Sequence, residues 1–480
     1  MHQNNSGLPW LDKGMLKDWY GIFSGFSIAL EAWRRGLNVT IYDSICSSYE
    51  ISMPEDYLPG LPGRTLCFRN TRVVDEASDA ADRICKDKQH TKELLAKAGV
   101  LVPAGRSFGG AATPEEMAEY ASKLGFPVVL KPVDGEKGKG VIVGIRDESA
   151  LLRDLHYVRQ ELDYKRVIIE RHVEGNECRI LVVGDQVVGA IRRIPANVVG
   201  NGRNTIEELI AIKNRKRRNN PCTSSSLIKV DRQVISCMGK LGHALDSIPE
   251  EGEQVFLREN SNVSAGGDPV DVTDNISEAV KRNAVRAVKA IPGLYHAGVD
   301  VLLDDSKGEA DPGVIIEINS RPMISLHLFP VKGTPRDTAG AIVDLNFPAT
   351  LGYRSRRQND RMYFDRSILE PIIKGMASSV TLKSIPLDGL QFCKVMLYGA
   401  FSGIGFEKWV QLQAVRNNLS GYVEAVEGER ARLVLAGMKG DIKRLLMLLE
   451  KGQAGAKPEG IYVKECRTKV FLGFGHALNK

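Results

Sequence analysis

The chain lacks the sequence signals of several common protein classes. Its eight cysteines are scattered, with no CxxC pair and no Cys/His cluster at zinc spacing, so we expect a reduced, cytoplasmic setting rather than a zinc site or a disulfide scaffold. The sequence contains no GxxxxGK[ST] P-loop, and no GxGxxG follows a first strand. Residues 1–14 lack a basic segment followed by an apolar run, and no apolar stretch is long enough to cross a bilayer. We therefore expect neither a secretory signal nor a membrane anchor.

The composition is that of an ordinary globular protein. The length of 480 residues suggests roughly three domains, with 43% hydrophobic and 26% charged residues. The net charge of +6 permits anionic substrates without implying nucleic-acid binding, because 65 basic residues are interleaved with 59 acidic ones. The basic run Lys213–Asn220 could contact RNA or an acidic polymer, or it could be a solvated helix end. We expect no nucleic-acid partner.

The N-terminal region reads as a small α/β domain. Residues Ser27–Gly36 have helical periodicity that ends at a glycine, and Val39–Asp43 follow as a strand. Nothing in this region indicates a catalytic role, so we expect it to be a scaffold for the domain that follows.

The stretch Phe126–Val143 (FPVVLKPVDGEKGKGVIV) combines an apolar strand, a lysine and a glycine-rich cationic loop. If the ammonium of Lys131 is buried at the end of this strand, it must find an anion. Gly138 and Gly140 allow backbone N–H groups to approach an anion closely. The stretch predicts a phosphate-binding cradle, and the alternative is an exposed turn rich in Gly and Lys.

Charged residues also occur on a helix and at a strand end. Lys88 and Lys92 lie four apart on a predicted helix and share a face, where they are either solvated or placed for phosphate. Glu170 ends a second apolar strand, and its carboxylate can accept a hydrogen bond from an adenine amino group while the backbone near Val173 supplies the rest of that edge. A downstream acid such as Glu177 can hold ribose hydroxyls. The alternative is a strand edge with solvated acids.

The segment Gly298–Pro322 predicts a hairpin of two apolar strands. Glu317 and Asn319 are two apart and project from one face, and Asp300 can come opposite them on the partner strand. Three oxygen-bearing side chains on a buried face favour a magnesium ion, whereas on a solvent face they would need no explanation.

Taken in order, these residues resemble those of an ATP-grasp ligase over about residues 87–348. Within that superfamily, residues 191–214 and 245–274 and the EINSRP segment resemble the ATP-grasp part of cyanophycin synthetases. The resemblance implies that ATP and Mg²⁺ are held between two α+β subdomains. It implies these roles: Lys88, Lys131, Gly138 and Gly140 at the phosphates, Glu170 and Val173 at adenine, Glu177 at the ribose, Asp300, Glu317 and Asn319 at magnesium, Arg258 and Arg192 as catalytic cations over the carboxylate and the acyl-phosphate, and Arg192, Arg193, Arg321, Ser325 and His327 at the substrates.

The activity implied by the resemblance is an ATP-dependent carboxylate–amine ligase that joins amino acids or peptides through an acyl-phosphate. The Mur-ligase-like half of cyanophycin synthetases is not found here, so we expect single-step ligation rather than polymerisation. Three alternatives stay open: a thiol- or hydroxyl-acceptor ligase of the same fold, a non-catalytic nucleotide-binding regulatory protein, and a nucleic-acid binder. The oligomeric state is open as well.

Residues 390–478 resemble an acylphosphatase domain, with a ferredoxin-like βαββαβ order. In that family an arginine and an asparagine serve catalysis, and here Glu407 and Ala425 stand at those positions, so we expect no phosphatase activity. The expected fold class is therefore α/β and α+β: an N-terminal α/β pre-ATP-grasp-like domain (1–86), an ATP-grasp domain (87–350), a connector (351–388) and an acylphosphatase-like domain (389–480).

Overall fold

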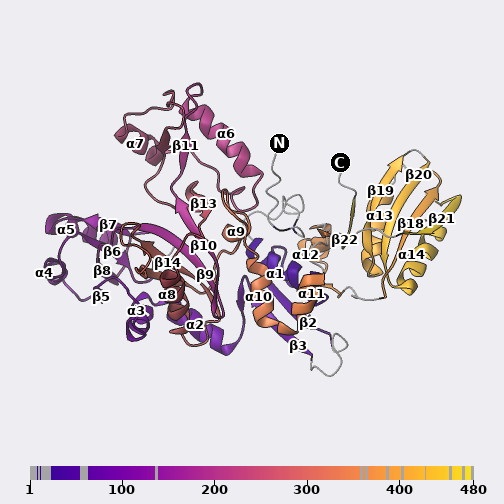
Figure 1. Ribbon diagram of the computed structural model, residues 1–480, viewed down its shortest axis with the longest axis horizontal. Helices are drawn as coiled ribbons and strands as arrows, with labels where there is room; N and C mark the ends of the chain where they lie inside the picture. Colours follow the sequence, from indigo (N-terminus) through magenta and orange to yellow (C-terminus); the bar gives the residue numbers. More distant parts are fainter. Residues whose placement is uncertain are drawn as a thin grey trace. The chain divides into compact units, whose positions relative to one another are not determined.

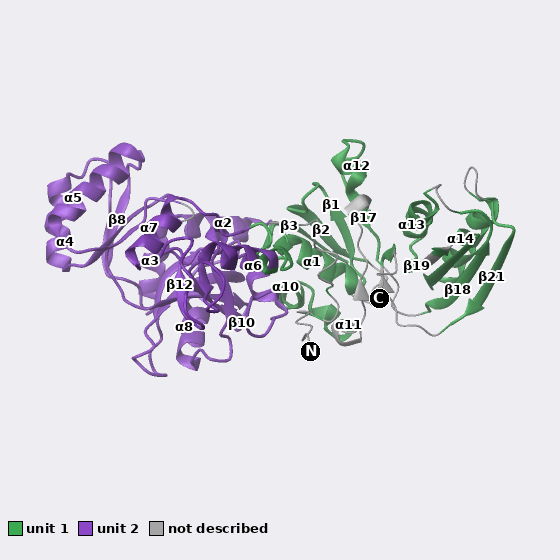
Figure 2. Cartoon of the chain, turned by 90° about the horizontal axis from the view of Figure 1, so that it is seen from above, with its two compact units in different colours: residues 1–73, 216–225, 339–480 green, residues 74–215, 226–338 purple. Residues whose placement is uncertain are grey.

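The computed structural model describes residues 8, 11, 23–54, 63–135, 139–356, 361–362, 366–384, 389–401, 405–427, 429–452, 457–466 and 471–476. Contacts divide the chain into two compact units, the first made of residues 1–73, 216–225 and 339–480 and the second of residues 74–215 and 226–338 (Figure 2). Within the described ranges, no helix is both long enough and apolar enough to cross a membrane.

Unit 1 contains the N-terminal α/β sheet, with strand order β17-β1-β2-β3-β4 (Figure 1). The predicted helix and strand are confirmed as α1 (Phe23–Arg34) and β1 (Asn38–Ile41). The sheet is completed by β17 (Val380–Leu382), which pairs antiparallel with β1 although it comes from the expected connector. The other elements of this part are β2 (Ser48–Met53), β3 (Arg64–Arg69), β4 (Arg72–Val73), α10 (Thr338–Asn346), η4 (Pro348–Thr350), α11 (Leu351–Arg356), β16 (Arg361–Met362), η5 (Arg366–Leu369) and α12 (Glu370–Ile373).

The C-terminal part of unit 1 is a five-stranded sheet with the order β21-β18-β20-β19-β23. Buried apolar residues such as Val395 and Leu433 on the sheet and Val410 and Leu445 on the helices belong to one core. The predicted βαββαβ order is confirmed by β18 (Gln391–Tyr398), α13 (Phe406–Arg416), β19 (Ser420–Glu427), β20 (Arg430–Gly437), α14 (Lys439–Lys451) and β21 (Gly460–Glu465), to which β22 (Phe471–Leu472) and β23 (Phe474–His476) are added.

The largest sheet of unit 2 is antiparallel and has the order β13-β10-β9-β14-β15. Apolar side chains on one face of the sheet, among them Ile180 and Val299, form a core with Ala284 of α8 and Leu95 of α3. Successive side chains of a strand point to opposite faces, so the neighbouring polar side chains Arg179 and Asp300 project from the other face. The elements are α2 (Glu76–Lys86), α3 (Lys88–Lys97), β9 (Asn176–Val183), β10 (Gln186–Ile194), β13 (Asp268–Asp271), α8 (Glu278–Lys289), β14 (His296–Leu303), β15 (Val314–Asn319) and α9 (Ser325–Leu328).

A four-stranded sheet with the order β5-β8-β6-β7 forms a second layer of unit 2. Helix α4 starts at a capping box made by Thr113 and Glu116, which explains why it begins at Pro114. The helices of this part share a core with the sheet that includes Met117, Leu130 and Ile169. The elements are β5 (Gly105–Phe108), α4 (Pro114–Leu124), β6 (Val128–Pro132), β7 (Ile142–Ile145), α5 (Glu148–His156), η2 (Tyr157–Glu161) and β8 (Val167–Arg171).

A small lobe inserted after β10 carries the basic run. It contains β11 (Asn197–Val199), α6 (Ile206–Arg218), α7 (Arg232–Lys240), β12 (Gln254–Phe256) and η3 (Val263–Ala265) around a core of its own. Lys213 lies 2.5 Å from Asp268 and donates to Asn197 O at 2.8 Å, and the Arg217 side chain is buried. The helix end is therefore partly solvated: Arg215 and Arg218 are exposed, whereas Arg217 is not.

Candidate functional site

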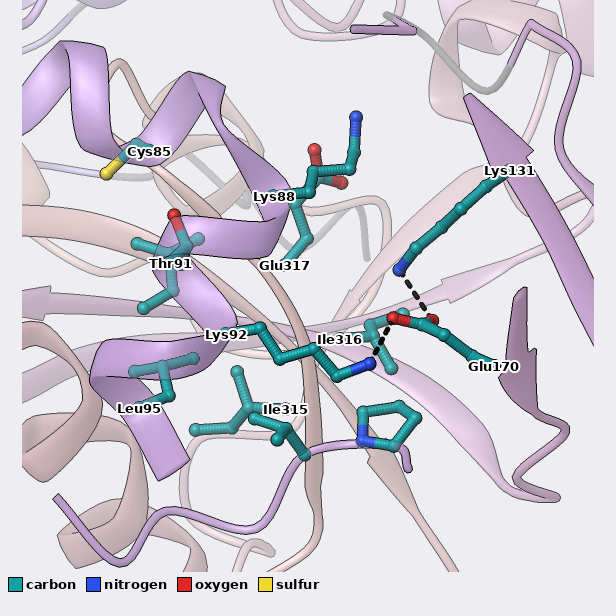
Figure 3. Close-up of a pocket in the computed structure, with 13 residues that line it drawn as sticks. Cys85, Lys88, Thr91, Lys92, Leu95, Lys131, Glu170, Ile315, Ile316 and Glu317 are labelled. Atoms are coloured by element: carbon teal, nitrogen blue, oxygen red, sulfur yellow. Dashed lines mark hydrogen bonds and ion pairs between the residues drawn. The ribbon is translucent and has the colours of Figure 1, made fainter. Parts of the chain in front are cut away.

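A cluster of two lysines and one glutamate joins α3 to the four-stranded sheet (Figure 3). The Asp87 side chain caps α3, so the helix begins at Lys88 and places Lys92 one turn later on the same side. Lys92 Nζ lies 2.8 Å from Glu170 Oε1, and Lys131 Nζ lies 2.7 Å from Glu170 Oε2. Both carboxylate oxygens of Glu170 are therefore engaged by ammonium groups.

This cluster modifies the sequence predictions for Lys131 and Glu170. Lys131 is only 9% exposed, and the anion that it needs is Glu170 in this chain. Burial lowers the pKa of Lys92, and the attraction of Glu170 only partly offsets this effect. Lys92 was not among the predicted site residues, and its spacing of four residues from Lys88 was the signal that could have identified it.

One pocket gathers residues from α3, both sheets and the segment between α3 and β5. It is lined by Lys88, Lys92, Lys131 and Glu170, and also by Glu317 of β15. Apolar side chains complete the lining, among them Leu95, Val102, Ile316 and Ile318. The remaining space is about 20 Å³, which is room for about one water molecule and far too little for a nucleotide. The ion pairs of Glu170 must therefore open before a nucleotide can enter.

The glycine-rich loop is described only in part. Lys88 Nζ donates to Gly135 O at 2.7 Å, which connects α3 with the beginning of this loop. Gly140 has φ +75°, and a Cβ there would lie 2.9 Å from a Pro132 side-chain atom, so a side chain would be strained and crowded. Gly138 lies outside the described residues. Val173 is half-buried beyond the end of β8.

The predicted hairpin pairs as expected. Asp300 lies directly opposite Glu317, and Asn319 lies opposite Gly298, in the antiparallel pair β14–β15. Asp300 is 2% exposed and accepts from Arg179 Nε and, at 2.7 Å, from Arg179 Nη2, while Arg193 Nη2 lies 3.4 Å away. Burial alone would raise the pKa of Asp300, but the two guanidinium groups outweigh it and hold the pKa below its usual value.

The three predicted metal ligands differ in their capacity to bind a cation. Within the described residues, no hydrogen bond or ion pair occupies the Glu317 carboxylate, and the buried Asn319 Nδ2 has no partner. These groups can turn hard oxygen atoms towards Mg²⁺. Asp300 fits only if it shares its lone pairs between arginine and the metal, which a carboxylate with about four acceptor sites allows. A group of three His, Cys, Asp or Glu side chains suited to a metal does not occur in the described parts of the chain.

Arg193 connects Glu177, the predicted ribose-binding residue, with Asp300, one of the predicted metal ligands. Glu177 accepts from Arg193 and, at 2.8 Å, from Ser261 Oγ, so Arg193 bridges Glu177 and Asp300. Arg192 Nη2 instead lies 3.0 Å from Asp305 Oδ1. Arg179 was not among the predicted site residues. Its alternation with Glu177 on β9, which places both on one face, was the available signal.

The two remaining arginines have ion-pair partners on other elements. Arg258, 9% exposed, lies 2.5 Å from Asp231, the residue that caps α7. Arg321 lies 2.7 Å from Asp82 of α2. Neither partner belongs to the lysine pocket, so the catalytic role of Arg258 and the substrate role of Arg321 stay predictions.

Ser325 and His327 of α9 are both buried. His327 Nδ1 has no hydrogen-bond partner within the described residues and lies 2.7 Å from where a Cβ on Gly189 would stand, so β10 needs a glycine there. Burial, together with the charge of Arg179, lowers the pKa of His327 to about 3. The imidazole is therefore neutral at pH 7, and its assigned substrate role stays a prediction.

The two antiparallel sheets, with the lysines of α3 and β6 facing Glu317 of β15, define an ATP-grasp fold, and the C-terminal sheet defines an acylphosphatase-like domain. Residues 85–209 match the RimK-like ATP-grasp domain, and residues 393–474 match the acylphosphatase family. The chain thus carries a RimK-like ATP-grasp domain and a C-terminal acylphosphatase domain.

Similar proteins support this assignment. The chain is 38% identical over 281 residues to cyanophycin synthetase of Trichormus variabilis, covering 58% of this chain and 30% of that protein. It is 31% identical over 330 residues to the glutathione biosynthesis bifunctional protein GshAB of Clostridium perfringens, covering 67% of this chain and 40% of the relative. The crystal structure of a bifunctional glutathione synthetase from Pasteurella multocida matches with a TM-score of 0.54 and 26% identity, over 70% of this chain and 44% of that one. The chain therefore spans less than half the length of these relatives.

Proposed function

We propose that the chain is an ATP-dependent carboxylate–amine ligase that forms an amide bond between amino acid or peptide substrates. The observation that carries this proposal is the pocket in which Lys88 and Lys131 meet Glu170 and Glu317. Within this pocket, the two lysines are cations suited to phosphate, Glu170 is a carboxylate suited to the adenine base, and Glu317 is an oxygen ligand suited to a metal. The printed names of the relatives, a cyanophycin synthetase and a glutathione biosynthesis protein, agree with a synthetic reaction.

Nucleotide binding starts with an exchange of ion pairs. The phosphates of ATP replace Glu170 as the anion at Lys131, while Lys88 leaves Gly135 O for a second phosphate oxygen. Glu170 then accepts from the adenine amino group beside the backbone of Val173, and Glu177 takes the ribose. Gly138 and Gly140 supply backbone N–H groups over the phosphates.

Mg²⁺ would be held by Glu317 and Asn319, with Asp300 shared between the metal and Arg179. When bound, the ion neutralises phosphate charge as two anions are brought together. The residues of this chain contribute the alignment, because β14 and β15 fix the ligands on adjacent strands.

The reaction proposed has two displacement steps. A substrate carboxylate oxygen attacks the γ-phosphorus and ADP leaves, which gives an acyl-phosphate; an amine then attacks its carbonyl carbon and phosphate leaves as the amide forms. Arg192 and Arg258 are the proposed cations over the carboxylate and the acyl-phosphate, and loss of such a donor costs about 2.7–4 kcal/mol in the barrier. Arg193, Arg321 and the α9 residues Ser325 and His327 are proposed to contact the substrates.

The test is a phosphate-release screen of amino acids and dipeptides in pairs with ATP and Mg²⁺, followed by mass spectrometry of the products. A pair that releases phosphate and gains the mass of the condensed product in the wild type, but not in Lys131→Ala, supports the proposal. Product masses and hydroxylamine lability separate amide from thioester or ester, which tests the alternative acceptors.

A non-catalytic nucleotide-binding role is the second candidate, because Arg179 and Arg193 already engage Asp300. It predicts saturable ATP binding without phosphate release for any pair of substrates. The cytoplasmic setting expected from the sequence remains a proposal; none of the eight cysteines, which all lie in the described ranges, forms a disulfide.

A further inference from the structure

A second cavity in unit 2 lies beside the turn that follows α3. Its volume is about 190 Å³, well above the roughly 10–15 Å³ that a single water needs. A small organic molecule therefore fits. The lining consists of Gly99 and Leu101 from the turn, Ala279, Arg282, Asn283 and Arg286 from α8, and Pro312 from the β14–β15 connection.

Two guanidinium groups face this cavity from one side of α8. Arg282 and Arg286 are four residues apart, and like charges at this spacing repel each other. Neither guanidinium group forms an ion pair or a hydrogen bond with another described residue. Glu278, an acid on the same helix, acts on Arg282 only at a distance, because it is paired with Lys281 at 2.8 Å. Both side chains are exposed, so water and not a protein anion surrounds the two charges, and an incoming anion meets no competing acid.

The rest of the cavity lining is uncharged. The buried Asn283 donates its Nδ2 to Pro312 O at 3.1 Å and to Gly313 O at 3.3 Å, which holds the amide in a fixed orientation. Leu101, Ala279 and Pro312 add apolar surface, and no acidic side chain is among the lining residues. Planar guanidinium groups recognise carboxylate and phosphate oxygens in pairs. The lining thus suits an anionic group joined to a short apolar segment.

The turn after α3 connects this cavity with the lysine pocket. Gly99 and Leu101 line the cavity, whereas Val102 and Pro103 line the lysine pocket. Leu101 O accepts from Ile315 N at 2.9 Å, and Ile315 also lines the lysine pocket. A shift of this turn would therefore alter both sites.

We propose that the Arg282–Arg286 cavity is a regulatory site for a small organic anion bearing a carboxylate or phosphate group, and that its occupancy changes the affinity of the lysine pocket for nucleotide. Anion binding stands independently of the proposed ligase activity. The coupling rests on the lysine pocket being a nucleotide site, and it is reciprocal, so nucleotide must change the anion affinity by the same factor.

The first experiment measures anion binding by calorimetric titration of the full chain with inorganic phosphate and, separately, with succinate at constant ionic strength. We expect a saturable site for at least one of them that Arg286→Ala weakens; inorganic phosphate can also occupy the lysine pocket, so phosphate binding that Arg286→Ala leaves unchanged does not count for this cavity. Arg286→Ala should weaken binding at least about tenfold, since charge-assisted hydrogen bonds are lost. Ala279→Phe, which fills the cavity without changing charge, should abolish it.

The matched control is Lys289→Ala, which removes a positive charge from the same helix outside the cavity, where Lys289 pairs with Asp185. It should leave binding unchanged. The site would be overturned if neither anion showed saturable binding. It would also be overturned if Lys289→Ala weakened binding as much as Arg286→Ala, or if Ala279→Phe left binding unchanged.

The second experiment measures the Kd of a fluorescent ATP analogue with and without saturating anion, using succinate or its phosphonate analogue so that inorganic phosphate does not compete for the lysines. We expect at least about a fivefold change in the wild type and none in Arg286→Ala. An unchanged Kd with the anion bound overturns the coupling. Failure of the analogue to bind at all contradicts the proposed function and leaves the anion site to be judged by the titrations alone.

Discussion

Replacing Glu170 by glutamine should destabilise the protein through the two lysines that its carboxylate holds. The substitution keeps the shape of the side chain but removes the charge that lies 2.8 Å from Lys92 and 2.7 Å from Lys131. All three side chains are largely buried, with exposures of 6% for Glu170, 12% for Lys92 and 11% for Lys131. Glutamine leaves two ammonium groups close together with no anion between them.

The magnitude follows from the geometry. With the two ammonium groups roughly 6 Å apart, their repulsion is about 3 kcal/mol at an effective dielectric constant of about 20. Removal of one partner from a buried ion pair typically costs about 3–5 kcal/mol. We expect the free energy of unfolding of the ATP-grasp part to fall by about 3 kcal/mol at pH 7.

Urea denaturation followed by intrinsic fluorescence measures this change, with Glu174→Gln as the control because Glu174 is exposed just beyond the same strand. Tripolyphosphate should restore much of the lost stability in Glu170→Gln, since it supplies the missing anion to both lysines. Equal stability of the Glu170→Gln and Glu174→Gln proteins would refute the reasoning, and so would an absence of recovery with tripolyphosphate.

Four further outcomes are expected. Lys131→Ala and Glu317→Ala should each abolish phosphate release while retaining the far-ultraviolet circular dichroism of the wild type, and wild-type turnover by Glu317→Ala would contradict the metal assignment. Because the pKa of Asp300 is held below its unfolded value, its contribution to stability is present above pH about 4 and is lost as pH falls through the lowered pKa; acid unfolding of Asp300→Asn should lack this component. At least one substrate should carry a carboxylate that stays free in the product, so amidated amino acids at both positions should fail in the phosphate-release screen. Finally, the full chain should not hydrolyse benzoyl phosphate above buffer, because we expect Glu407 to place a negative charge at the position of the acylphosphatase arginine. Turnover that Glu407→Ala removes would show the opposite.

Sequence patterns were sufficient to predict a helix or a strand wherever the segment shows the hydrophobic periodicity of that element. Two apolar runs predicted β14 and β15, and the expectation that Asp300 can lie opposite the Glu317 and Asn319 face agrees with its pairing with Glu317. The βαββαβ order of the C-terminal domain followed from the same local signals. These predictions succeeded because the period of a strand or a helix is fixed by neighbouring residues in the sequence.

The pairing of strands that lie far apart in the sequence could not be predicted from local periodicity. The pairing of β17 with β1 joins residues more than 300 positions apart, and a three-residue strand has too little periodicity to be recognised. The basic run was likewise ambiguous, because only the fold brings Lys213 next to Asp268. Such contacts depend on the path of the whole chain.

The candidate site also depends partly on local sequence and partly on contacts between distant segments. The sequence by itself singled out the residues that we propose to bind phosphate, base and metal, because Lys131, Glu170 and Glu317 stand at the ends or on the faces of apolar strands. Only the tertiary structure decided how their charges are balanced: Glu170 joins Lys92 to Lys131, and Arg179 neutralises Asp300. The physical reason is that a buried charge must be paired, and its partner is whichever opposite charge the packing of distant elements brings within reach.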